Sequence, residues 1–259
     1  MKTNPLREAV ERGELQIGTW INMVRNPAIL PMLKAAGLDF ARIDMEHSSP
    51  SIETVANMAL VARALDFSLA VRMPKANREW ITRLLDVGVT TLHCPQVESA
   101  KHAEEIVAAS RYAPVGQRGW GGSTPAYDYD FSVTPAEKKA FANRQVFVTV
   151  MFETAEAFKD LDDIAAMDGI DALTLGPADL AQNLGVAGTP DQAKVIDEKR
   201  TLIVEAAKKH GKTCAMLVSS AEQARQWKEA GVLILAYSSE VEVMSAAFRD
   251  AMARIKAPA

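Results

Sequence analysis

The feature of this sequence that most constrains its fold is a regular alternation of short apolar segments with amphipathic ones. Eight apolar runs have the length and bounded character of strands; they cover 17–21, 40–44, 68–73, 90–95, 146–152, 172–176, 213–217 and 232–237. The segments between them carry apolar residues at the three- and four-residue spacing of helices; they cover 53–65, 77–87, 98–110, 155–167, 194–209, 220–230 and 239–256. The repeated alternation of strand and helix, with eight strands, predicts an α/β fold with a closed, parallel (β/α)8 TIM barrel.

The length of the chain favours one barrel. Its 259 residues match a single TIM barrel of about 250 residues, so residues 1–259 are expected to form one domain. A doubly wound open sheet is the alternative. That fold typically has a Gly-rich turn after its first strand, and the corresponding stretch here, GTWINMVRNP, contains no such turn. The polar segment 1–16 predicts a capped N-terminal helix, and the long connection at 111–135 is a candidate functional loop.

Composition narrows the class of partner. A formal net charge of −4 gives no basic surface for nucleic acid, and no apolar run reaches the roughly 18 residues that a membrane span needs. The N-terminal segment lacks the apolar centre of a signal peptide. Cys94 and Cys214 lie in apolar runs without a CxxC motif, which is typical of buried thiols in a reducing compartment. We therefore expect a cytoplasmic protein that acts on a small molecule.

Polar residues at the ends of the predicted strands are the candidates for chemistry, because such barrels build their active sites at the carboxyl ends of the strands. These residues are Asp44, Glu46 and His47 after the second strand, Arg72 at the third, Glu153 at the fifth and Asp179 after the sixth. Glu153 and Asp179 are about one βα repeat apart, so they should project from adjacent strands. Two neighbouring carboxylates, without clustered histidine or cysteine, suit a hard divalent cation such as Mg²⁺ or Mn²⁺.

Each candidate also has a purely structural interpretation. Asp179 could cap a helix, Glu153 could interact with a helix dipole, and His47 could be a hydrogen-bonded structural histidine. Arg72 differs, because an arginine flanked by apolar residues at a strand end usually has an anionic partner. Together the four favour a catalytic site. Structural roles are expected for Glu46 (structural or solvated), for His93, His102 and His210 (core or surface), and for Asp171 (at the opposite, stabilising end of the barrel).

Several stretches of the sequence resemble a known enzyme family. The stretches IDMEHSS, VRMP, LLDVGVTTLHCPQVESA, YAPVGQRGWGG, FETAEAF and LTLGPADLAQNLG are similar to signature segments of the metal-dependent 4-hydroxy-2-oxoheptanedioate aldolase family, whose members also cleave 2-keto-3-deoxy sugar acids. The resemblance covers nearly the whole chain and is weakest after about residue 185. It implies a barrel, usually in homohexamers with exchanged C-terminal helices, and a class II pyruvate aldolase reaction.

The resemblance also implies a role for each matching residue. Carried over by position, Glu153 and Asp179 would hold a divalent metal (Mg²⁺, Mn²⁺ or Co²⁺), and Arg72 would lie beside the enolate oxygen. Asp44 with His47 would hold the catalytic water. The remaining matches are Asp86, which the family supplies from a neighbouring subunit, and the pocket-lining residues Trp20 and Leu217.

Some positions depart from the family pattern or are ambiguous. Met151 stands where the family usually has glutamine, Trp120 where it has a small residue, and residues 237–240 (YSSE) where it has Gly-Ser-Asp. These changes fall on the substrate side and leave the identity of the aldehyde open. Asp86 ends the segment REWITRLLD, so from the residues alone it could be a solvated residue at the amino-terminal face of its own barrel.

Chemistry derived from the residues agrees with an aldol reaction. Aldol cleavage must stabilise a pyruvate enolate, which a divalent cation does as a Lewis acid, and no lysine ends a strand to form a Schiff base. Backbone N–H groups at Gly176, Ala178 and Asp179 should bind the pyruvate carboxylate. The resemblance adds further expected substrate contacts, which are Pro177, Trp20, Leu217 and Trp120. His47, oriented by Asp44, should take the proton of the 4-hydroxyl group.

The sequence therefore predicts a lyase that reversibly splits a 4-hydroxy-2-oxo acid into pyruvate and an aldehyde. Two alternatives remain. One is an oxaloacetate decarboxylase with the same site, because both reactions pass through the pyruvate enolate. The other is a catalytically silent barrel that binds a 2-oxo acid.

Overall fold

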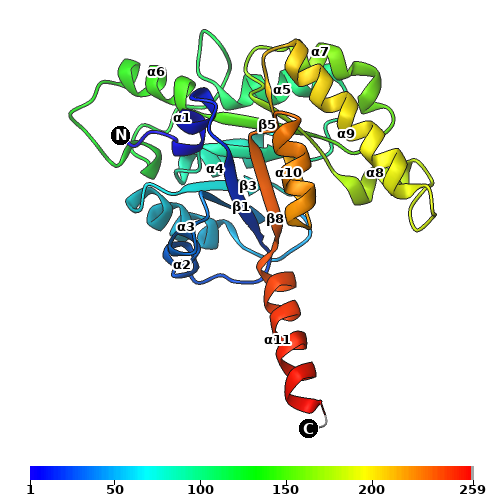
Figure 1. Ribbon diagram of the computed structural model, residues 1–259. Helices are drawn as coiled ribbons and strands as arrows, with labels where there is room; N and C mark the ends of the chain where they lie inside the picture. Colours follow the sequence, from blue (N-terminus) through cyan, green and yellow to red (C-terminus); the bar gives the residue numbers. More distant parts are fainter. Residues whose placement is uncertain (258–259) are drawn as a thin grey trace.

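The computed structural model describes residues 1–257 and shows a closed barrel of parallel strands (Figure 1). The strands follow one another around the barrel in chain order: β1 (Gln16–Ile21), β2 (Phe40–Asp44), β3 (Ser68–Arg72), β4 (Thr91–Cys94), β5 (Phe147–Phe152), β6 (Ala172–Leu175), β7 (Thr213–Val218) and β8 (Ile234–Ser239). β1 pairs in parallel with both β2 and β8. This closure confirms the predicted barrel and excludes the open sheet.

Helices surround the barrel, and most of them follow the predicted segments. These are α3 (Ile52–Ala64), α4 (Arg78–Asp86), α5 (Ala100–Ser110), α9 (Gln192–Lys209), α10 (Ala221–Glu229) and α11 (Glu240–Lys256). The helical segment predicted at 155–167 consists of a short 3-10 helix (Ala157–Asp160) followed directly by α7 (Leu161–Ala166).

Three further helices give no periodic signal in the sequence. They are α2 (Ile29–Ala35), α6 (Pro135–Gln145) and α8 (Pro177–Asn183). α2 and α8 have seven residues each, which is too short for a helical period to be recognised. α6 begins at a capping box formed by Thr134 and Glu137, but it buries only Lys138 and Ala142. It follows the predicted loop 111–135, which itself contains a 3-10 helix (Pro125–Tyr127).

The predicted N-terminal helix is α1 (Pro5–Glu11), and it closes one end of the barrel. The Asn4 side chain caps this helix by accepting from the Leu6 N–H, and the Asn4 amide donates to Thr91 Oγ1 on β4 at 3.0 Å. Asn4 is fully buried. Its side chain therefore both caps α1 and connects this helix to the start of β4.

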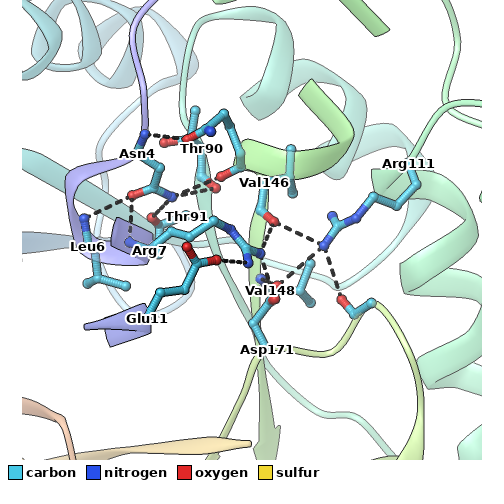
Figure 2. A network of polar contacts seen from close by, with 12 residues as sticks. Asn4, Leu6, Arg7, Glu11, Thr90, Thr91, Arg111, Val146, Val148 and Asp171 are labelled. Atoms are coloured by element: carbon cyan, nitrogen blue, oxygen red, sulfur yellow. Dashed lines mark hydrogen bonds and ion pairs between the residues drawn. The ribbon is translucent and has the colours of Figure 1, made fainter. Parts of the chain in front are cut away.

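A second polar link at this end is centred on Asp171, which directly precedes β6 (Figure 2). Its carboxylate accepts from Arg7 at 2.6 Å, from Arg111 at 3.3 Å and from the Val148 main-chain N–H at 2.7 Å. Asp171 thus lies at the amino-terminal end of the strands, as predicted, where it joins α1, β5 and β6.

The barrel interior is filled toward the α1 end and becomes more open toward the other. An apolar cluster fills this end; it contains Leu6 on α1 and the strand residues Trp20, Phe40, Phe147, Ala172, Ala215, Ile234 and Ala236. Toward the carboxyl ends of the strands the interior opens into a cavity.

α11 extends away from the barrel, and Figure 1 shows its C-terminal end far from the strands. Large apolar side chains are exposed along it: Val241, Val243, Phe248, Met252 and Ile255. Within residues 1–257, no helix has both the length and the apolar character needed to cross a membrane. Cys94 and Cys214 are buried and free; the cytoplasmic location stays a prediction.

Candidate active site

A cavity of about 340 Å³ lies at the carboxyl ends of the strands, and this volume suits a small organic ligand. Its lining residues are Trp20, Asn22, Arg42, Asp44, His47, Arg72, His93, Met151, Thr174, Leu175, Gly176, Pro177, Ala178, Asp179, Leu217, Ser238, Ser239 and Glu242. Most of the predicted site residues are among them. Glu153 is buried at the end of β5, beside Gly176.

A buried ion pair between Asp44 and Arg72 forms one wall of the cavity. Arg72 donates from Nε to Asp44 Oδ1 at 2.9 Å and from Nη2 to Oδ2 at 2.7 Å. Asp44 and Arg72 face each other because they are register partners on β2 and β3. Burial raises the pKa of Asp44, but the hydrogen bonds and charge of Arg72 outweigh burial, so the pKa lies below its ordinary value.

The expected side-chain pair of Asp44 with His47 is not formed. Asp44 Oδ1 accepts instead from the main-chain N–H groups of Glu46 and His47, at 3.0 and 3.3 Å, so it shapes the turn rather than orienting the imidazole. The His47 ring is half exposed at the cavity mouth. Its Nε2 lies 3.8 Å from Glu46 Oε2 and 4.0 Å from Asp179 Oδ2. His47 can therefore still reach a water or ligand above these carboxylates.

Two further carboxylates, Glu46 and Glu153, lie near Asp179 of the cavity lining, close enough for the charges of Glu46 and Asp179 to act on Glu153. Burial, followed by the negative charges of Glu46 and Asp179, raises the pKa of Glu153 to about 7, although the Gln96 N–H donates to it at 2.7 Å. Burial also raises the pKa of Glu46, which is 3.2 Å from Arg72 Nη1. The Glu46 side chain is only 8% exposed, which favours the structural alternative over the solvated one, and it lies beside both Arg72 and His47.

Gln96, after β4, was not among the predicted site residues. Its main-chain N–H binds Glu153, and its side-chain amide donates to Glu46 at 2.9 Å. Gln96 adopts a positive φ of 52°, which is uncommon for a residue other than glycine and allows both contacts. The strand-end rule applied to CPQ would have indicated it.

Glycine is required at position 176 by the close approach of Glu153. A Cβ atom at Gly176 would lie 2.4 Å from Glu153 Oε1, so any larger residue would displace the carboxylate. The Gly176 N–H donates to the Phe152 carbonyl at 3.1 Å. This N–H is therefore already paired within the chain, whereas the N–H groups of Ala178 and Asp179 open α8; that any of them binds a pyruvate carboxylate stays a prediction.

The carboxylates suit a hard divalent cation that keeps several positions for water and ligand. Within residues 1–257, no three His, Cys, Asp or Glu side chains converge as a metal site, so any cation would have few protein ligands. Glu153 follows β5 and Asp179 lies in the first turn of α8, after β6, so these two could provide oxygen ligands. Burial first, and then the negative charges of Glu46 and Asp179, raise the pKa of Glu153, and the positive charge of a bound cation would offset both effects.

Asp86 and Trp120 lie outside the lining of this cavity. Asp86, at the end of α4, accepts from Arg118 Nη2 at 2.7 Å. Trp120 packs against Tyr112 and Tyr127, with ring centroids 5.6 and 5.5 Å apart. Within one chain these residues form a cluster on the 111–135 loop, so their expected substrate roles stay predictions.

Comparison with known proteins agrees with this geometry. The model of the HpcH/HpaI aldolase/citrate lyase family matches residues 16–247. The chain belongs to this family. It is 32% identical to the 4-hydroxy-2-oxo-heptane-1,7-dioate aldolase of Escherichia coli, over 99% of this chain and 96% of that protein. It is 39% identical to the 4-hydroxy-2-oxovalerate aldolase of Novosphingobium aromaticivorans, over 71% and 69% of the two chains.

The fold of the family is also the fold of this chain. The crystal structure of an HpcH/HpaI aldolase from Desulfitobacterium hafniense matches with a TM-score of 0.93 and 29% identity, covering 99% of this chain and 98% of that one. As a member of the family, the protein is an enzyme and a carbon–carbon lyase.

Proposed function

We propose that the protein is a divalent-metal-dependent class II aldolase that reversibly cleaves a 4-hydroxy-2-oxo acid into pyruvate and an aldehyde. The observation that carries the proposal is the buried Arg72–Asp44 pair beside the carboxylates Glu153 and Asp179, in a cavity sized for a small acid. The names of the Escherichia coli and Novosphingobium relatives, both aldolases of 4-hydroxy-2-oxo acids, support this substrate class.

The roles of the residues follow from their positions. A cation held by Glu153 and Asp179 (Mg²⁺, Mn²⁺ or Co²⁺) would supply Lewis-acid stabilisation of the pyruvate enolate. Arg72 is held rigidly by Asp44 and places a positive charge on the cavity wall, where it stabilises the developing oxyanion. The N–H groups of Ala178 and Asp179 bind the ligand carboxylate. His47 accepts the 4-hydroxyl proton, directly or through water.

The metal requirement has a direct test. Removal of divalent cations with a chelator should abolish pyruvate release, and Mn²⁺, Co²⁺ or Mg²⁺ should restore it. Full activity of the stripped enzyme, or a lysine adduct trapped by borohydride, would contradict the proposal.

Comparing two reactions tests the assignment of His47 and Arg72. Aldol cleavage needs a proton taken from a hydroxyl group, whereas decarboxylation of oxaloacetate does not. His47→Ala should therefore impair cleavage more than decarboxylation, and Arg72→Ala should impair both because both pass through the enolate. Equal losses in the two reactions for His47→Ala would show that His47 is not the base.

We also propose a homohexamer in which α11 packs on a neighbouring subunit. The helix leaves Phe248 and Ile255 exposed, at 68% and 72% of their surface, and burying such side chains would stabilise an assembly by about 2 kcal/mol each. Phe248→Glu should shift the protein to smaller species in light scattering. An unchanged mass for this variant would remove α11 from the interface.

The same assembly would explain Asp86, which lies away from the cavity of its own chain. We propose that it acts in the site of a neighbour. Reassembling mixed oligomers of inactive Asp86→Asn and inactive His47→Ala proteins should restore part of the activity, because some sites would contain both intact residues. No recovery, or an active Asp86→Asn variant, would leave Asp86 as a residue that only pairs with Arg118.

A further inference from the structure

The deepest part of the cavity contains a second arginine that the proposed mechanism does not use. Arg42 precedes Asp44 by two residues on β2, so both side chains point into the barrel and Arg42 lies about 7 Å further in along the strand. With Trp20 on β1 and His93 on β4 it forms what we call the floor site. The exposed fractions of Arg42, Trp20 and His93 are only 3%, 8% and 1%.

The guanidinium of Arg42 has no counterion within the described part of the chain. It forms no hydrogen bond or ion pair there, and its Nε is buried without an acceptor. It lies instead over the faces of Trp20 and Phe40, at 4.8 and 5.5 Å from the ring centroids. Asp44 and Glu46, the nearest acids along the strand, are both engaged by Arg72.

A buried arginine without an anion is costly, because the charge loses its hydration without compensation. Burial, and then the charge of Arg72, lower the pKa of Arg42 to about 9, so Arg42 is still positively charged at neutral pH. A cost of this kind is usually found where a ligand supplies the missing charge.

The neighbours of Arg42 also offer donors rather than negative charge. Among residues 1–257, no hydrogen-bond partner faces the buried Trp20 Nε1 or either ring nitrogen of His93. Burial lowers the pKa of His93 well below its ordinary value, so the ring is neutral and has one N–H donor. Donors around an unpaired guanidinium match a carboxylate, which can accept two parallel hydrogen bonds from Arg42.

We propose that the floor site binds the distal carboxylate of the substrate, which makes Arg42 the residue that selects dicarboxylic 4-hydroxy-2-oxo acids over monocarboxylic ones. This inference rests on the proposed function, in which the 2-oxo acid end of the substrate lies near Glu153 and Asp179. The aldehyde released would then carry a carboxylate of its own.

Two non-cleavable ligands of equal length test the floor site by direct binding. 2-Oxoglutarate has a terminal carboxylate where 2-oxovalerate has a methyl group. In calorimetry with Mg²⁺ present, the wild-type protein should bind 2-oxoglutarate at least about tenfold more tightly, as expected for a charge-assisted hydrogen bond. Arg42→Met should abolish this preference, and Arg42→Lys should keep part of it.

Controls separate a binding role from a folding role. Arg225→Met removes a surface guanidinium, 66% exposed and paired with Glu222, and should keep the preference. Arg42→Met should unfold at the same temperature as the wild-type protein or higher, because it removes an unpaired buried charge. Loss of the preference in a folded Arg42→Met protein supports the floor site. Equal binding of the two ligands by the wild-type protein, or a preference that survives Arg42→Met, overturns it.

Two separate measurements distinguish a failure of the floor-site proposal from a failure of the aldolase proposal. Pyruvate release from dicarboxylic and monocarboxylic 4-hydroxy-2-oxo acids reports the reaction, and its absence for both would overturn the aldolase proposal. The ratio of the two kcat/KM values reports the floor site, and Arg42→Met should lower that ratio by at least about tenfold. A ratio unchanged by Arg42→Met would overturn the floor site while the aldolase proposal stands.

Discussion

Replacing Glu153 with glutamine should stabilise the cation-free protein, and the gain should grow with pH. The pKa of Glu153 is about 7 rather than the ordinary 4.5, so between these values the folded protein keeps a proton that the unfolded chain has released. Linkage then requires the free energy of unfolding to fall as pH rises through this window. Glutamine does not titrate and avoids that loss.

The magnitude follows from the pKa difference. A pKa change of one corresponds to about 1.4 kcal/mol, so the full difference corresponds to roughly 3 kcal/mol. We therefore expect a gain of about 2–3 kcal/mol above pH 7 and little gain below pH 5. The Gln96 N–H can still donate to the glutamine oxygen, so no buried donor loses its partner.

The difference in unfolding free energy between the wild-type protein and Glu153→Gln can be measured by urea unfolding, with circular dichroism as the signal. The measurements are made at pH 5 and pH 8, with a chelator present and at one protein concentration. Glu156→Gln is a matched control, because that side chain is 69% exposed, and its effect should not depend on pH beyond a few tenths of a kcal/mol. Equal effects of Glu153→Gln at both pH values, or a destabilised variant at pH 8, would refute the reasoning. Adding Mn²⁺ should stabilise the wild-type protein more than the variant.

Three further predictions concern the same structure. Gly176→Ala should lower stability by about 1–3 kcal/mol and weaken Mn²⁺ binding, because its Cβ would meet Glu153; unchanged Mn²⁺ affinity in calorimetry would contradict this. Asp171→Asn should cost about 2–4 kcal/mol in urea unfolding, because Arg7 and Arg111 would lose a shared and largely buried counterion. As the pH is raised toward 7, the affinity for Mn²⁺ should increase by up to about tenfold per pH unit, because Glu153 must lose its proton to bind the cation. Above pH 7 the affinity should level off. An affinity that does not change with pH would exclude Glu153 as a ligand.

The sequence by itself determined the barrel and the end of it where the site forms. The spacing of apolar residues defines eight strands and most helices because each pattern repeats within a short stretch of chain. Once the strands are parallel, their carboxyl ends must meet, and this places Asp44, Arg72, Glu153 and Asp179 around one cavity. The short helices α2 and α8 were not predicted, because seven residues contain too few apolar positions to show a helical period.

Only the tertiary structure decided which of these side chains contact one another. Register between β2 and β3 brings Arg72 to Asp44, although His47 is closer to Asp44 in the chain. The positive φ of Gln96 turns its N–H toward Glu153, and the absence of an acid beside Arg42 appears only when the inward faces of several strands are compared. Spacing along a chain determines which face a residue occupies. Partners, burial and pKa depend on neighbours that other strands supply, and these are set by how the strands pack in three dimensions.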